Sequence, residues 1–192
     1  MRFLIRAAVL LLAVSTPLAG GAHAATYAGV TLPDTYPVEG QTLVLNGMGL
    51  RTLTVFNVRA YVAGLYLAQR SGNGPQILAS KAPKVVLIQF LHSATKAQVE
   101  AQYRAGEQKN CASGGCDPAD AKDFEALVAA APAVEVGDTS TYVFTDGRVR
   151  VYANQRMIAN IANRDLAFHM LEGFIGAHPP AEDLKRGLLG GQ

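Results

Sequence analysis

Apolar residues follow two periods along this chain, and each period predicts a different kind of element. Alternating or short apolar runs rich in β-branched and aromatic residues are typical of strands, and they dominate the first half and return near residue 140. Apolar residues at spacings of three and four are typical of amphipathic helices, and these gather in the second half. The expected strands are residues 42–46, 50–57, 60–68, 84–91, 140–145, 148–153 and 156–161.

Turn and capping residues mark the expected boundaries. Thr95 and Gln98 have the spacing of a capping box, and Asn163 is a helix N-cap residue whose helix is closed by Gly176. The Asp-Gly dipeptide at 146–147 stands between two alternating runs, which is a strong β-hairpin signal. The expected helices are residues 76–80, 95–108, 118–131, 163–176 and 179–190.

The order of these elements predicts the fold class. The strands mostly follow one another, so they are expected to pair antiparallel, and the helices come mainly after them. This order indicates an α+β fold, with a sheet that carries its helices on one side. Residues 25–192 are long enough for one domain with a sizeable core.

The N-terminal segment has the pattern of a secretory signal peptide. Arg2 and Arg6 precede an apolar stretch at 7–14 that is too short to span a bilayer, and the Ala-His-Ala tripeptide at 22–24 is a cleavage signal. We therefore expect residues 1–24 to be removed after export to the periplasm or outside the cell. A buried N-terminal helix and an uncleaved anchor are the alternatives.

The charge balance argues against nucleic acid as a partner. Without Arg2 and Arg6, 15 of the 17 basic residues remain, and they face 15 acidic ones. A neutral chain without a Lys/Arg run lacks the electrostatic footprint of a nucleic-acid-binding protein. No later segment approaches 18 consecutive apolar residues, so no stable membrane insertion is expected after cleavage.

Few residues suggest metal, cofactor or hydrolytic chemistry. His92, His169 and His178 are isolated, so no metal site and no cofactor are expected, and nucleotide-binding and hydrolase motifs are missing from the sequence. Cys111 and Cys116 flank a glycine-rich loop. In an oxidising compartment they are expected to form a disulfide.

Four runs resemble the chalcone isomerase family, especially its secreted bacterial branch. They are residues 45–51 (LNGMGLR), 61–67 (YVAGLYL), 84–91 (KVVLIQFL), and 171–176 (LEGFIG) continuing through 184–190 (LKRGLLG). The resemblance extends from about residue 29 to residue 190. It implies an open-faced β-sandwich, in which a curved antiparallel sheet is covered by helices with a ligand cleft between them.

The resemblance also implies a role for Arg51, which follows what reads as a glycine-punctuated turn. Plant enzymes of this family close a hydroxychalcone to a flavanone, and an arginine stabilises the developing enolate oxygen. Arg51 matches that arginine. Tyr61 stands where the plant enzymes have threonine, and a tyrosine there resembles the fatty-acid-binding branch, where arginine and tyrosine together hold the carboxylate. Strand alternation places Tyr61, Ala63 and Leu65 on one face.

Two further family positions can be matched in two ways. The plant enzymes use a tyrosine and an asparagine seven residues apart on a helix. Tyr103 and Asn110 have this spacing but require an insertion after Leu91, whereas anchoring at Leu91 gives Gln98 and Ala105. The second register is favoured because Asn110 looks like part of the cysteine loop. The family's late serine or threonine falls at 153–156, which contains no hydroxyl.

These residues lead to three hypotheses. The first is a periplasmic protein that binds a small amphipathic ligand, such as a fatty acid, through Arg51 and Tyr61 without converting it. The second is an isomerase (an intramolecular lyase) that acts on an unknown enone. The third is a structural envelope protein with a closed cleft beside Arg51. No pattern indicates a protein partner.

Overall fold

The computed structural model describes residues 24–53, 56–111 and 118–191. The strands are β1 (Ala24–Tyr27), β2 (Val30–Pro33), β3 (Thr35–Val38), β4 (Gln41–Leu53), β5 (Val58–Leu67), β6 (Lys84–Phe90), β7 (Thr139–Thr145), β8 (Arg148–Ala153) and β9 (Arg156–Ile161). The helices are α1 (Gly74–Ala79), α2 (Lys96–Cys111), α3 (Pro118–Ala130), α4 (Arg164–Ile175) and α5 (Glu182–Leu188).

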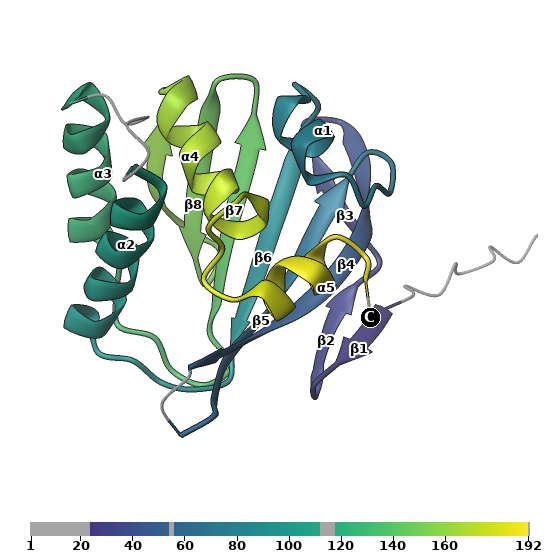
Figure 1. Cartoon of the computed structure of the whole chain (residues 1–192), viewed down its shortest axis with the longest axis horizontal. Helices are drawn as coiled ribbons and strands as arrows, with labels where there is room; N and C mark the ends of the chain where they lie inside the picture. Colours follow the sequence, from purple (N-terminus) through teal and green to yellow (C-terminus); the bar gives the residue numbers. More distant parts are fainter. Residues whose placement is uncertain (1–23, 54–55, 112–117, 192) are drawn as a thin grey trace, which may run out of the picture.

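One curved sheet carries the helices on one face (Figure 1). Its seven strands run antiparallel in the order β3-β4-β5-β6-β7-β8-β9, so each strand pairs with its neighbour in sequence. Ala63 and Leu65 belong to the main core with the helices, and Tyr61 packs against it. Val62 and Tyr66 lie in two smaller clusters on the opposite face, where the β1–β2 hairpin also packs. The α+β prediction and the predicted faces of β5 are confirmed.

The sheet curls toward the face without helices. Glu39, in the turn between β3 and β4, accepts a hydrogen bond from Arg150 of β8 at 2.6 Å. Three strands lie between β4 and β8, so a flat sheet would separate them by about 19 Å. Arg150 pairs with Val143, whose side chain belongs to the core on the helix-free face, so that face is the concave one.

The glycines before Arg51 allow a helix to pack closely against a strand. They do not form the expected turn, because β4 runs unbroken through Gly47 and Gly49. A Cβ at Gly47 would collide with the carbonyl of Gly187, and one at Gly49 with the carbonyl of Leu184. Glycine is needed here because the backbone of α5 rests directly on the backbone of β4.

Asn46 marks a β-bulge where β4 meets two other segments. The register with β5 shifts between Leu45 and Gly47. The Asn46 side chain donates to the carbonyls of Leu188 at 2.7 Å and Ser71 at 3.0 Å, and it accepts from the Ser71 amide at 2.7 Å. A buried amide with these partners holds β4, α5 and the β5–α1 connection together.

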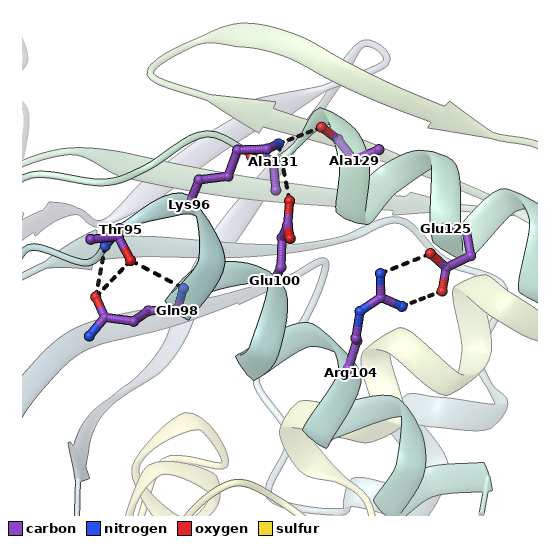
Figure 2. Close-up of polar contacts among 8 residues, drawn as sticks. All are labelled: Thr95, Lys96, Gln98, Glu100, Arg104, Glu125, Ala129 and Ala131. Atoms are coloured by element: carbon purple, nitrogen blue, oxygen red, sulfur yellow. Dashed lines mark hydrogen bonds and ion pairs between the residues drawn. The ribbon is translucent and has the colours of Figure 1, made fainter.

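The helix signals in the sequence are largely confirmed. The Thr95 amide donates to the Gln98 side chain at 2.8 Å, and the Gln98 amide donates back to the Thr95 hydroxyl, which is a capping box (Figure 2). Asn163 caps α4 by accepting from the Leu166 amide at 3.0 Å. Figure 2 also shows Arg104 of α2 paired with Glu125 of α3, an exposed contact that joins the two helices.

Several boundaries differ from the predictions, because packing extends or shortens an element. The strands expected at 42–46 and 50–57 are one strand, β4, which ends at Leu53 and pairs with β5 from Val44 to Leu53. Asn110 lies inside α2 and not in the cysteine loop. The last helix begins at Glu182, after the two prolines. The sequence pattern did not predict strands β1 to β3. Each has 4 residues, which is too few for an alternation of apolar and polar residues to be recognised.

Some predictions fall outside the described residues. The structure does not describe residues 1–23 or Cys116. The signal peptide and the disulfide between Cys111 and Cys116 therefore stay predictions. In the described part of the chain, no helix is both long and apolar enough to span a membrane.

Candidate ligand-binding site

A cavity of about 420 Å³ lies between the helix-bearing face of the sheet and α2, α3 and α4. Its size is within the range of small-molecule sites. Most of its wall is apolar, with a few polar side chains among the apolar ones. The apolar wall includes Leu53, Ile88, Phe90, Val99, Phe124, Val134, Ile158, Met170 and Phe174. The third hypothesis, a closed cleft beside Arg51, is therefore not supported.

Arg51 and Tyr61 lie directly opposite each other on β4 and β5, and both line the cavity. Opposed residues on paired strands present their side chains to the same face of the sheet. A β-bulge follows Arg51, between it and Thr52, and such bulges redirect side chains. The Arg51 guanidinium donates from Nη1 to the carbonyl of Pro180, in the segment before α5.

Tyr61 is a neutral phenol in this site. Burial raises its pKa to about 12, although the positive charge of Arg51 opposes this shift. Its ring packs edge-to-face on Phe90, with the ring centres 6.0 Å apart. The ring is thus fixed, and the hydroxyl group stays available as a hydrogen-bond donor at any physiological pH.

Two further tyrosines form a hydrogen-bonded pair in the cavity wall. The hydroxyls of Tyr103 on α2 and Tyr142 on β7 are 2.6 Å apart. Burial raises the pKa of both phenols, and the hydrogen bond from Tyr142 partly offsets the rise for Tyr103. Tyr142 also packs on Phe174 of α4, with ring centres 5.4 Å apart.

Asn110 reaches the same cavity from the last turn of α2. Its Nδ2 donates to the carbonyl of Gly106 at 3.0 Å. Its Oδ1 is buried and has no hydrogen-bond partner among the described residues. A buried acceptor without a partner is costly, so this oxygen is suited to a donor on a bound molecule.

The structure thus brings all four sequence-predicted polar residues, Arg51, Tyr61, Tyr103 and Asn110, to one cavity. Gln98 and Ala105 of the other register also border it. The Gln98 amide oxygen, however, is used in the capping box of α2, and alanine offers no polar side chain.

Sequence reasoning missed Tyr142 and Ser140, both of which line the cavity from β7. Ser140 supplies a hydroxyl in the wall, although none occurs at 153–156. Strand alternation alone could have placed both residues on the helix-bearing face. Their contact with a ligand site depends on where α2 and α4 pack.

Three histidines are among the residues that border the cavity. They are His92, His169 and His178. His169 Nδ1 lies 3.2 Å from a carboxylate oxygen of Glu172, one turn along α4. Within residues 24–53, 56–111 and 118–191, no three His, Cys, Asp or Glu side chains are grouped to hold a metal ion.

Comparison with known proteins agrees with this architecture. The sequence profile described as chalcone isomerase-like matches residues 24–190, and the chain belongs to this family. No curated protein sequence matches it significantly. Among solved structures, a fatty-acid binding protein of Arabidopsis thaliana is similar, with a TM-score of 0.72 and 15% sequence identity over 87% of this chain and 96% of the other. At this identity the likeness shows a shared fold.

Proposed function

We propose that the protein binds a small apolar carboxylate, such as a fatty acid, in this cavity and does not convert it. The observation that carries the proposal is the opposition of Arg51 and Tyr61 on the wall of a largely apolar cavity. The cavity supplies two donors for an anionic head group and apolar surface for a chain.

The chemistry of the two side chains fits a carboxylate. A guanidinium has five N–H donors, and Arg51 uses one on Pro180, so the others can meet both carboxylate oxygens. Tyr61 keeps its proton because burial raises its pKa to about 12, so it adds a neutral donor beside the cation. Each methylene group buried in the cavity contributes about 0.8 kcal/mol.

Two further points support the proposal. The similar Arabidopsis structure is that of a fatty-acid binding protein, which shows that the fold can hold such a ligand. The N-terminal pattern of Arg2, Arg6 and an apolar stretch supports, as a further part of this proposal, export to the periplasm or outside the cell.

Calorimetric titration with dodecanoate tests the role of Arg51. Arg51→Ala should weaken binding by about 10- to 100-fold, because it removes hydrogen bonds to a charged group worth about 1.5–3 kcal/mol. Arg59→Ala is the matched control, since Arg59 lies on the same hairpin and does not line the cavity. Equal affinity of wild type and Arg51→Ala for dodecanoate would refute the proposal.

Dodecanoate methyl ester separates the head-group contribution from the chain contribution. The ester lacks the negative charge, so wild type and Arg51→Ala should bind it with similar affinity. Native mass spectrometry of protein purified from its own compartment would identify the natural ligand. A co-purified molecule without an acidic group would contradict the proposed ligand class.

A second function, an intramolecular lyase acting on an enone, is favoured by a different observation. Tyr103 and Asn110 border the same cavity as Arg51, in agreement with the roles that the resemblance to the plant enzymes implies for them. Arg51 would stabilise the enolate oxygen, and the tyrosines would position a proton donor. The test is the steady-state conversion of a hydroxychalcone by wild type and by Tyr103→Phe. Conversion by wild type that is at least about tenfold slower in Tyr103→Phe, while the dodecanoate affinity of the variant is unchanged, would establish this function instead.

A further inference from the structure

Two hydroxyl-bearing residues on β7 line the cavity, and the proposed carboxylate site does not use them. They are Ser140 and Tyr142, which are two positions apart on the strand and therefore lie on the same face of the sheet. Their partners on β6 are Ile88 and Val86, which belong to the core beneath the helices. We call Ser140 and Tyr142, together with Tyr103 on α2, the hydroxyl subsite.

The hydroxyl subsite has hydrogen-bonding capacity that the chain leaves unused. One hydroxyl hydrogen lies between the oxygens of Tyr103 and Tyr142, which are 2.6 Å apart. The other hydrogen of this pair has no acceptor among the residues that the structure describes, and the half-buried Ser140 hydroxyl makes no hydrogen bond within that part of the chain. Polar groups that are withdrawn from solvent and lack partners are costly, so this wall is suited to a polar group on a bound molecule.

An apolar part of the cavity wall separates the hydroxyl subsite from the carboxylate site. Tyr61 is opposite Phe90 on β6, and Ser140 is opposite Ile88, which is two positions from Phe90 on the same strand. Two positions along a strand and two strands across the sheet separate the Cα atoms of Tyr61 and Ser140 by about 12 Å. Ile88 and Phe90, which lie between them, line the cavity. A ligand that contacts both polar places therefore needs an apolar segment between its two polar groups.

The side chains of the hydroxyl subsite are neutral. Burial raises the pKa of Tyr142 and of Tyr103, so both phenols keep their protons. A negative charge on Tyr61 would raise the pKa of Tyr142 further, which indicates that the two polar places are near enough to interact across the cavity. Protonated hydroxyls both donate and accept hydrogen bonds. They suit an alcohol, which does the same, whereas the subsite supplies no cation for a second carboxylate.

We propose that the hydroxyl subsite binds an alcohol group on the chain of the ligand, so that the ligand class is a hydroxylated apolar carboxylate. This rests on the proposed function, because Arg51 and Tyr61 fix the head group away from Ser140 and Tyr142. An alcohol at that distance exchanges hydrogen bonds with the subsite, whereas the chain of a simple fatty acid leaves the same groups unpaired. Water is the alternative occupant, and it would give no preference for a hydroxylated chain.

Calorimetric titration with matched pairs of ligands tests the subsite in wild type. The pairs are octanoate with 8-hydroxyoctanoate, decanoate with 10-hydroxydecanoate, and dodecanoate with 12-hydroxydodecanoate, which place the hydroxyl at three distances from the carboxylate. Burial of an alcohol without a partner would weaken binding by about tenfold. We expect at least one hydroxy acid to bind as tightly as its parent acid or more tightly. Weaker binding of all three hydroxy acids overturns the proposal.

Two variants assign the preference to the hydroxyl subsite. In Tyr142→Phe, the affinity of the best hydroxy acid relative to its parent acid should fall by about tenfold, because the alcohol loses a partner. Ser140→Ala keeps the contact between Tyr103 and Tyr142 and should lower the same ratio. Tyr152→Phe is the matched control, since Tyr152 packs on the opposite face of the sheet, and its ratio should equal that of wild type. A ratio that neither Tyr142→Phe nor Ser140→Ala lowers overturns the proposal.

Dodecanedioate distinguishes an alcohol from a second anion at the far end of the chain. The neutral hydroxyls do not balance its second charge, so wild type should bind dodecanedioate more weakly than 12-hydroxydodecanoate. Tighter binding of dodecanedioate would show that the subsite accepts an anion, and the alcohol assignment would be wrong.

Arg51→Ala separates this proposal from the proposed function. The variant should weaken dodecanoate and 12-hydroxydodecanoate by the same factor, which leaves their ratio unchanged. If Arg51→Ala weakens neither acid while Tyr142→Phe lowers the ratio, the carboxylate site is wrong and the hydroxyl subsite is supported. If Arg51→Ala weakens both acids while the ratio ignores Tyr142→Phe and Ser140→Ala, only the hydroxyl subsite is wrong.

Discussion

Tyr103 and Tyr142 face each other across the cavity wall, with their hydroxyl oxygens 2.6 Å apart, and this contact joins α2 to β7. Only one hydroxyl hydrogen can lie between the two oxygens, so the other points elsewhere in the cavity. The rings are held by Phe124 against Tyr103 and by Phe174 against Tyr142. The pair therefore both supports the helix layer and offers one donor to a bound molecule.

Removal of one member of this pair should destabilise the fold. Tyr142→Phe and Tyr103→Phe should each lower the free energy of unfolding by about 1 kcal/mol, because a buried hydroxyl loses its partner. The double variant should cost less than the sum of the two, with a coupling of at least about 0.5 kcal/mol by urea denaturation. Additive effects would show that the hydroxyls do not depend on each other.

The close packing of α5 on β4 predicts opposite effects of two glycine-to-alanine changes. Gly49→Ala should lower the free energy of unfolding by about 2–3 kcal/mol, because its Cβ meets the backbone carbonyl of Leu184. Gly106→Ala on α2 is the matched control, since its Cβ meets no atom within 4 Å. It should stabilise the protein by up to about 1 kcal/mol through helix propensity. Thermal denaturation of both variants compares them directly.

The buried tyrosines predict loss of stability at high pH. Burial raises the pKa of Tyr61 from 10.0 to about 12, and it also raises that of Tyr66. The unfolded chain therefore releases these protons at lower pH than the folded chain does. Stability should be complete below about pH 10 and fall as the pH approaches 12. Urea denaturation across this interval measures the slope.

A matched variant assigns part of that slope to a single residue. Tyr61→Phe removes one titrating group, so its stability should fall less steeply between pH 10 and 12 than that of wild type. Identical slopes would mean that Tyr61 titrates as it does in the unfolded chain. Tyrosinate absorbance recorded in parallel follows ionisation independently of unfolding.

The strained turn at Phe56 predicts a gain in stability when it is relaxed. Phe56→Gly should raise the free energy of unfolding by up to about 1 kcal/mol, because glycine adopts a φ near +66° without strain. Asn57→Gly is the control, since asparagine already tolerates this region, and its effect should be smaller. A loss of stability in Phe56→Gly would show that the ring makes contacts that support the fold.

Local signals made much of the fold predictable. Three of these signals are found in the structure: the Thr95–Gln98 capping box, the Asn163 cap and the Asp-Gly hairpin. Each depends only on residues that are a few positions apart in the sequence. The turn predicted from Gly47 and Gly49 is wrong. Glycine is needed at these positions because the backbone of α5, which is far away in sequence, packs against them, and no local pattern shows that contact.

The sequence by itself determined the α+β class, the order of the strands and the helix caps, because periodicity and capping act between near neighbours. Only the tertiary structure decided that Tyr142 joins Tyr103 and that Asn110 turns into the cavity. These relationships depend on how α2 and α4 pack on a curled sheet, and packing brings together residues that no local pattern connects.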